Sequence, residues 1–205
     1  MVRVAVFASG NGSNYEAIMK YTAALADPGY EISLVVCDQP QAGVIARALR
    51  WRTPVFVVER RRFATKEAFE QQILARLRKD RIDFVALAGY MRLIGPTLLQ
   101  EYYGRMINLH PSLLPAFPGL DAVGQALKAG ARVTGVTVHY VDAGMDTGPI
   151  IAQQAVPIDG DDDHDSLSRK IHEVEHELYP RIVRQCALGE IILDQGQVRK
   201  PGSQR

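Results

Sequence analysis

In the first half of the chain, short apolar runs alternate with segments whose apolar residues recur every three or four positions. The runs are typical of buried strands, and the longer segments are typical of amphipathic helices. This pattern predicts strands at Val2–Ala8, Ile32–Cys37, Val55–Val58, Asp83–Ala88 and Arg105–Leu109, and helices at Asn14–Ala26, Gly43–Arg50, Lys66–Lys79 and Pro96–Tyr103. The alternation predicts an α/β fold with a single doubly wound, mostly parallel sheet that is covered on both faces.

The pattern changes after Gly130, where two long strand-like segments follow each other without a helix between them. We expect Val133–Val141 and Pro149–Ile158 to be antiparallel strands at one edge of the sheet. A stripe of apolar residues then predicts a long C-terminal helix at about Asp165–Leu188. No linker separates two folded halves, so we expect one domain over residues 1–195 and a flexible tail at 196–205.

The composition is that of an ordinary globular domain without an excess of either charge. The 205 residues include 24 Lys and Arg and 23 Asp and Glu, which gives a net charge of +1. This balance argues against general binding to nucleic acids or membrane surfaces, because such binding favours a basic excess. No apolar run approaches the roughly 20 residues of a membrane span, and we expect no signal peptide. Since Cys37 and Cys186 are the only cysteines, a disulfide scaffold is excluded and a cytoplasmic location is expected.

Ligands of such a sheet bind at the carboxyl ends of its strands, and glycine-rich, polar segments follow the predicted strands there. The first segment is Ser9-Gly10-Asn11-Gly12-Ser13-Asn14. Its glycines let the backbone approach a ligand, Ser13 and Asn14 can cap the helix, and the free amides favour a phosphate. Tyr15 occupies the third-glycine position of a dinucleotide fingerprint, which weakens that interpretation, although Asp38 lies near the place of a ribose-binding acid. A tight turn without a ligand is the alternative.

Three further segments follow later strands. Gly89–Pro96 offers apolar side chains and backbone groups that suit a flat heterocycle, or else a hydrophobic loop that fills the core. Asn108 and His110 point to the same face of an extended strand, where an amide and an imidazole can stabilise an oxyanion and move a proton. Pro111 keeps His110 extended. Asp142–Pro149 can place a carboxylate near the imidazole and keep it protonated, although by itself an ordinary hairpin turn explains this segment better.

The segment His172-Glu173-Val174-Glu175-His176 fits two zinc-peptidase patterns on a predicted helix and places both histidines on one face. However, Ile182 stands where a third histidine would fall, and Glu190 follows too closely for a usual third ligand. Short patterns of this kind recur by chance on charged helices, so we interpret the segment as a solvated helix face.

Together, the four loop segments resemble motifs of one family, the folate-dependent phosphoribosylglycinamide formyltransferases. The motifs, in the family's order and spacing, are Ser-Gly-Asn-Gly-Ser-Asn, Ala-Gly-Tyr-Met-Arg-Leu-Ile, Asn-Leu-His-Pro-Ser-Leu-Leu-Pro-Ala-Phe-Pro-Gly and Asp-x-Gly-x-Asp-x-Gly-Pro-Ile. The resemblance covers about residues 2 to 190 and implies a Rossmann-like formyltransferase fold. It implies that the amine of glycinamide ribonucleotide attacks the formyl carbon of 10-formyltetrahydrofolate, the cosubstrate, in de novo purine biosynthesis. The partners are then small molecules, and neither a metal nor a covalent enzyme intermediate is needed.

The resemblance also implies roles for residues of this chain. Asn108 donates to the developing oxyanion, His110 stabilises it as an imidazolium and assists proton transfer, and Asp146 keeps His110 protonated and orders a relay water. The residues implied for the ribonucleotide are Gly12, Ser13, Asn14, Gly89, Asn108, Pro111, His172 and Glu175. Those implied for the folate are Lys66, Met91, Arg92, Leu93, Ile94, Asp142 and Asp146.

One position departs from the family pattern, because Asp121 stands where relatives often carry His, which puts a helper role for that residue in doubt. The nearest alternative function is a formyltetrahydrofolate hydrolase, which uses the same three residues with water as the acceptor. A zinc-dependent hydrolase at the His172–His176 segment and a non-catalytic nucleotide sensor are more distant alternatives. The sequence leaves a homodimer open.

Overall fold

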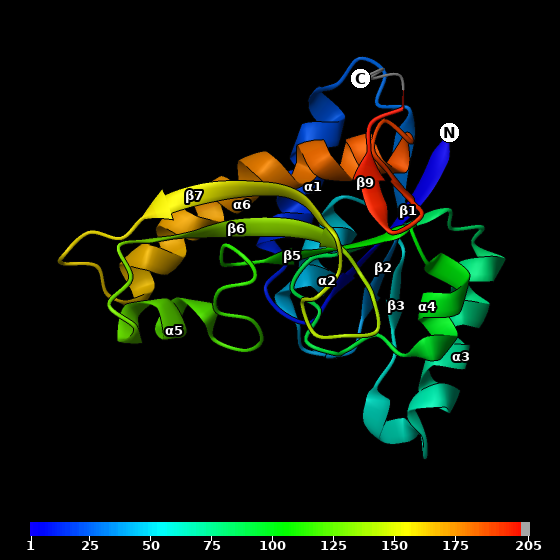
Figure 1. The fold of residues 1–205 in the computed structure, drawn as a ribbon. Helices are drawn as coiled ribbons and strands as arrows, with labels where there is room; N and C mark the ends of the chain where they lie inside the picture. Colours follow the sequence, from blue (N-terminus) through cyan, green and yellow to red (C-terminus); the bar gives the residue numbers. More distant parts are fainter. Residues whose placement is uncertain (202–205) are drawn as a thin grey trace.

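The computed structural model describes residues 1–201, which contain a seven-stranded sheet with helices on both faces (Figure 1). The strands lie in the order β3-β2-β1-β4-β5-β6-β7. Their bounds are Val2–Ala8 (β1), Tyr30–Cys37 (β2), Val55–Val57 (β3), Phe84–Leu87 (β4), Met106–His110 (β5), Val133–Tyr140 (β6) and Ile150–Pro157 (β7). Strands β1 to β5 are parallel, and β6 and β7 extend the sheet in antiparallel pairs. The predicted fold class is confirmed.

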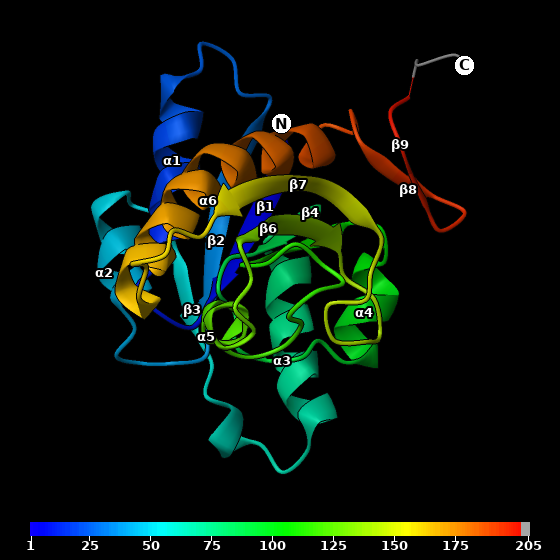
Figure 2. The same cartoon turned by 60° about the vertical axis from the view of Figure 1, so that its left-hand side comes forward.

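The helices form a layer on each face of the sheet (Figure 2). Their bounds are Ser13–Ala24 (α1), Gly43–Arg50 (α2), Lys66–Lys79 (α3), Pro96–Tyr102 (α4), Ala122–Lys128 (α5) and His164–Ala187 (α6), with a 3-10 turn η1 at Arg60–Arg62. Helices α1, α2, α5 and α6 pack on one face, and α3 and α4 pack on the other. Strand β1 supplies both cores by alternation, because Val4, Val6 and Ala8 face the first layer whereas Ala5 and Phe7 face the second.

A short C-terminal hairpin of β8 (Ile192–Asp194) and β9 (Gln197–Arg199) was not predicted, and neither were α5 and η1. The hairpin turns at Gln195 and Gly196, which both have the positive φ of a two-residue type I′ turn. Each of these strands has three residues that mix apolar and charged side chains, so no apolar run marks it in the sequence. The expected domain boundary at residue 195 falls in this turn, and residues 197–199 of the expected tail form β9. Residues 202–205 of that tail lie outside the described residues.

The strand order reverses between β1 and β4, because the chain proceeds from β1 to β3 on one side and from β4 to β7 on the other. Two loops therefore meet there, which we call the β1 loop (residues 10–14) and the β4 loop (residues 89–95). The amide of Ser9 donates to the carbonyl of Gly89 at 3.0 Å and joins their starting points. Ligands of α/β sheets bind at such a reversal.

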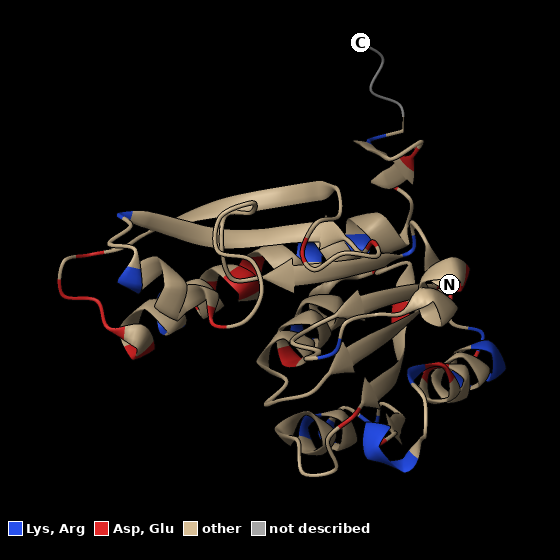
Figure 3. Cartoon of the chain, turned by 60° about the horizontal axis from the view of Figure 1, so that its bottom comes forward, with Lys and Arg blue, Asp and Glu red and all other residues tan. Residues whose placement is uncertain are grey.

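Charged residues of both signs lie mainly on helices and loops, and the strands carry few (Figure 3). The thiols of Cys37 and Cys186 are both buried and unbonded to each other. Within residues 1–201, every helix is too short or too polar to cross a membrane.

Candidate active site

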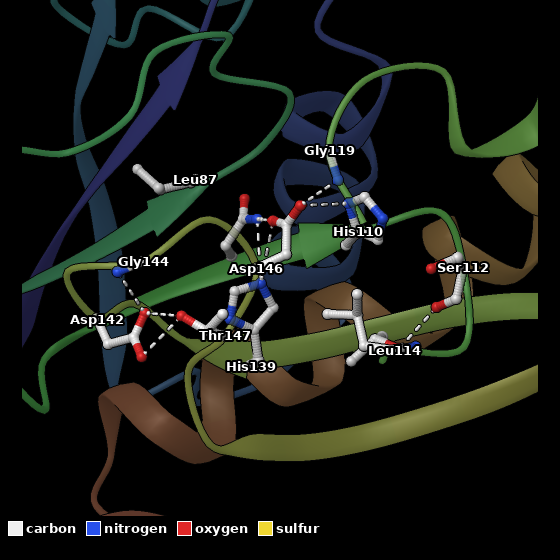
Figure 4. A network of polar contacts seen from close by, with 12 residues as sticks. Leu87, His110, Ser112, Leu114, Gly119, His139, Asp142, Gly144, Asp146 and Thr147 are labelled. Carbon is white, nitrogen blue, oxygen red and sulfur yellow. Dashed lines mark hydrogen bonds and ion pairs between the residues drawn. The ribbon is translucent and has the colours of Figure 1, made fainter. Parts of the chain in front are cut away.

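Asp146 is the centre of a polar cluster at the carboxyl end of β5 (Figure 4). It lies in the turn between β6 and β7 and has a left-handed backbone, with φ of 56°. Its Oδ2 accepts from the amide of Gly119 at 2.8 Å and lies 3.4 Å from His110 Nδ1. Its Oδ1 lies 3.5 Å from the side-chain amide of Asn108. The fold therefore brings together the three residues that the sequence predicted as catalytic.

The environment of Asp146 favours its charged form. Burial raises the pKa of this carboxyl, but it is outweighed by neighbouring groups that favour the charged form, among them the hydrogen bond from the Gly119 amide and the charge of His110. The net pKa of Asp146 lies below its ordinary value. Asp146 is therefore an anion near neutral pH and can act as a charge partner for an imidazolium.

His110 ends β5 and is buried, with an oxygen atom facing each ring nitrogen. Nε2 lies 2.8 Å from the carbonyl oxygen of Phe117, and Nδ1 faces Asp146. A carbonyl can only accept, so Nε2 carries a proton. A proton on Nδ1 as well would satisfy both contacts, which is the imidazolium form. Pro111 continues directly from this strand and is half-buried.

His139 is a member of this cluster that the sequence analysis missed. It is buried on β6, where it pairs in antiparallel register with Asn108. Its Nδ1 lies 2.8 Å from the carbonyl oxygen of Tyr140, so Nδ1 donates and Nε2 is left to accept from the Asn108 amide at 3.2 Å. His139 thus orients the Asn108 side chain. In the sequence, a polar residue within the apolar run Val133–Val141 was the available signal, but its use required the register.

The β1 loop has the backbone features of an anion site, although its capping differs from the prediction. Gly12, not Ser13 or Asn14, is the N-cap of α1, and no side chain caps the helix. A Cβ at Gly12 would lie 2.6 Å from Val44 Cβ, and its φ is 79°, so only glycine fits there. Since the amide of Glu16 is the first that bonds back into the helix, the amides of Ser13 and Asn14 point out of its end.

Asn14 joins the β1 loop to helix α6. Its side-chain amide donates to Glu175 Oε2 at 2.8 Å, and His172 Nδ1 lies 2.9 Å from the same oxygen. The hydrogen bond with Glu175 raises the pKa of His172 despite partial burial. Oδ1 of Asn14 is buried and has no partner in residues 1–201, so it can accept from a ligand. The predicted ribonucleotide residues Asn14, His172 and Glu175, from opposite ends of the chain, therefore lie in direct contact.

His176 does not join His172 as a ligand pair. The two rings stack with centroids 6.1 Å apart and planes 9° apart. Burial lowers the pKa of His176, whereas the Glu175 charge acts in the opposite direction. Nowhere in residues 1–201 do three or more His, Cys, Asp or Glu side chains gather in a way that could hold a metal ion.

The β4 loop forms the wall of a pocket of about 300 Å³. The residues that line it are Arg60, Lys66, Phe69, Glu70, Tyr90, Met91, Arg92, Leu93, Ile94 and Leu98. Met91 and Leu93 are exposed, which suits contact with a flat apolar ligand. Gly89 has a φ of 76° and starts the loop. The predicted folate residues from Lys66 and Met91 to Ile94 thus share one pocket.

Two residues predicted to bind the folate, Arg92 and Asp142, have polar partners within the protein. Arg92 Nε lies 2.5 Å from Asp38 Oδ2, so its charge is directed at that carboxylate, and Asp38 is accordingly not free to bind a ribose. Asp142 accepts from the Gly144 amide and the Thr147 hydroxyl and thereby shapes the loop that carries Asp146.

Asp121, the departure from the family pattern, caps α5 through the amide of Gly124. Its carboxylate pairs with His164 Nε2 at 3.0 Å, and both side chains are exposed. The hydrogen bond with His164 is the largest cause that lowers the pKa of Asp121. In this structure, the residue therefore ties α5 to the start of α6.

Comparisons with known proteins agree with this arrangement. The formyl transferase family profile matches residues 2–183. A phosphoribosylglycinamide formyltransferase of Bacillus subtilis (strain 168) is 55% identical over 187 residues, which cover 90% of this chain and 94% of that protein. The trifunctional purine biosynthetic protein adenosine-3 of Drosophila melanogaster is 41% identical over 192 residues, or 93% of this chain and 14% of that protein. The crystal structure of glycinamide ribonucleotide transformylase 1 from Geobacillus kaustophilus is similar with a TM-score of 0.87 and 56% identity, covering 90% of this chain and 98% of that one.

Proposed function

Since this chain belongs to the formyl transferase family, we propose that it transfers the formyl group of 10-formyltetrahydrofolate to the amine of glycinamide ribonucleotide. The chain is an enzyme, a formyltransferase of purine biosynthesis. The family implies a folate-type formyl donor. The observation that carries the proposal is the convergence of Asn108, His110 and Asp146 at the carboxyl end of β5, the strand next to β4.

The two loops suit the two substrates. The outward amides of Ser13 and Asn14 suit the phosphate, and Asn14 Oδ1 with Glu175 suits the hydroxyl groups of the ribonucleotide. The apolar rim of Met91 and Leu93 suits the pterin ring of the donor. The amine and the formyl carbon would then meet beside Asp146, because that residue lies at the carboxyl end of β5, the strand next to β4.

The reaction needs stabilisation of charge and movement of a proton, but no strong nucleophile on the enzyme. When the amine attacks the formyl carbon, the carbonyl oxygen gains negative charge. The Asn108 contact with Asp146 is long for a hydrogen bond, so that amide hydrogen is available to the oxyanion. The other hydrogen stays with His139, which holds the amide in position.

His110 and Asp146 handle the proton. Because His110 Nε2 is engaged by the Phe117 carbonyl, Nδ1 on the Asp146 side is the atom that exchanges protons. A water held by Asp146 takes the proton from the attacking amine and delivers one to the folate nitrogen that leaves. Asp146 stabilises His110 whenever it is an imidazolium, because the lowered pKa of the Asp146 carboxyl keeps that group negatively charged.

A donor-consumption assay tests the function. Purified protein is given 10-formyltetrahydrofolate with and without glycinamide ribonucleotide, in the presence of a chelator. We expect the donor to be consumed only when the ribonucleotide is present, with one formylated ribonucleotide formed per tetrahydrofolate. Consumption without the ribonucleotide would instead indicate the hydrolase, and dependence on a metal would indicate the zinc hydrolase.

We also propose small-molecule partners and a cytoplasmic location. The buried thiols of Cys37 and Cys186 suit a reducing compartment.

A further inference from the structure

Two buried carboxylates outside the catalytic cluster, those of Asp38 and Glu70, contact the β4 loop. We propose that Asp38 and Glu70 are positioning residues, which hold the β4 loop in the shape that binds the formyl donor. The inference rests on the proposed function, because it takes this loop as part of the donor site. Neither residue touches the catalytic cluster in the contacts described above.

Asp38 reaches the start of the β4 loop by two routes. Its Oδ1 accepts from the hydroxyl of Ser9 at 2.6 Å, and the same hydroxyl oxygen accepts from the amide of Met91 at 2.9 Å. Its Oδ2 pairs with Arg92 Nε at 2.5 Å. The Arg92 guanidinium also lies over the ring of Phe69 on α3, 5.8 Å from its centroid. The exposed Met91 and Leu93 therefore lie on a segment that is held at the backbone of Met91 and at the side chain of Arg92.

Glu70 holds the other end of the loop from helix α3. It is 2% exposed, and its Oε1 accepts from the amide of Gly95 at 2.6 Å. A Cβ at Gly95 would lie 2.7 Å from both carboxylate oxygens, so the backbone and the carboxylate are in direct contact. Lys66 Nζ lies 3.9 Å from Oε1, and Oε2 has no hydrogen-bond partner in residues 1–201.

The energetics argue for a role beyond stability. Burial of a carboxylate is unfavourable unless hydrogen bonds compensate for the lost water, and the Oε2 atom of Glu70 lacks such a partner. An apolar residue at this position would fill the space without that penalty. What an apolar residue would lack is the charge-assisted bond to the Gly95 amide, which fixes the loop.

The test is a kinetic comparison of four variants. Glu70→Ala and Ser9→Ala remove one anchor each, at opposite ends of the loop. Glu70→Gln keeps an oxygen that can accept from the Gly95 amide. Glu67→Ala is the matched control, because Glu67 is an exposed acid on the same helix. Thermal unfolding of each variant shows whether it is folded.

We expect Glu70→Ala and Ser9→Ala each to raise the KM for 10-formyltetrahydrofolate about tenfold. The KM for the ribonucleotide should stay within about twofold of wild type, Glu70→Gln should recover most of the loss, and Glu67→Ala should match wild type. If Glu70→Ala does not fold, Ser9→Ala and Glu70→Gln decide the matter. An unchanged donor KM in Ser9→Ala, or a loss in Glu70→Gln as large as in Ser9→Ala, would then overturn the inference.

The wild-type result separates the two hypotheses. A wild-type protein that transfers no formyl group overturns the proposed function and this inference with it. An active wild type whose anchor variants keep their donor KM, or raise both KM values equally, overturns the inference alone.

Discussion

The β1 loop and the β4 loop follow neighbouring parallel strands, yet they are held in different ways. The β1 loop owes its shape mainly to its own backbone, with Gly12 in a left-handed conformation and α1 starting at once behind it. The β4 loop is held by side chains from elsewhere, since Asp38 follows β2 and Glu70 lies on α3. A loop that presents backbone amides needs glycines, whereas a loop that presents apolar side chains needs anchors.

The catalytic cluster belongs to neither loop. It combines Asn108 and His110 at the end of β5 with Asp146 from the turn after β6, where the antiparallel part of the sheet begins. We therefore expect changes in the cluster to lower kcat, and changes beside a loop to raise one KM only.

The largest effect should come from the cluster. Asp146→Asn should lower kcat by about a thousandfold, because His110 loses its charge partner during proton transfer. Both KM values should stay within about twofold of wild type, which steady-state kinetics would show. The pH profile of kcat should shift as well, because Asp146 is charged above its lowered pKa and Asn is neutral throughout. Asp80→Asn, at an ion pair with Arg76 on α3, is the control. An Asp146→Asn variant with wild-type kcat would rule out the proposed role of Asp146.

An intermediate effect should be confined to the β1 side. Glu175→Ala removes the acceptor of the Asn14 amide and should raise the ribonucleotide KM about tenfold. The donor KM should not change. Glu173→Ala removes an exposed acid from the same helix and should behave like wild type. A rise in the donor KM with Glu175→Ala would show that α6 serves the other substrate.

A smaller effect should appear at the rim of the β4 pocket. Lys66→Ala removes a half-exposed cation beside the pocket and should raise the KM of the anionic folate about threefold at low salt. The difference should shrink as salt is added, because exposed charges are screened. Lys79→Ala, at the other end of α3, is the matched variant. A loss that is equally large at high salt would exclude a long-range charge effect.

The smallest effect concerns stability on the β1 side. The pKa of His172 is raised in the folded protein, so its stabilisation is fully present below about pH 6.5 and is lost as the pH rises through the raised pKa. Because the side chain is half-exposed, we expect His172→Ala to lower the free energy of unfolding by about 0.5 kcal/mol more at pH 6 than at pH 9. Denaturant unfolding at both pH values measures this. An equal loss at the two pH values would assign the effect to packing.

The same contrast explains what could be predicted from the sequence. Continuous apolar runs mark even the short strands β3 and β4, and an apolar stripe marks the long α6, so the sheet and α6 were predicted. The Gly10–Asn14 motif revealed the β1 loop locally. The anchors of the β4 loop could not be predicted, because Asp38 and Arg92 are 54 positions apart and meet only in the folded sheet. His139 was missed for the same reason, since its pairing with Asn108 depends on the antiparallel register.

The most direct measurement determines both KM values for Glu175→Ala and Glu70→Ala in one assay of formyl transfer. Two separate substrate loops predict a crossed result, in which Glu175→Ala raises only the ribonucleotide KM and Glu70→Ala raises only the donor KM. If both variants raise the same KM, or each raises both, the division of the site between the β1 and β4 loops is contradicted.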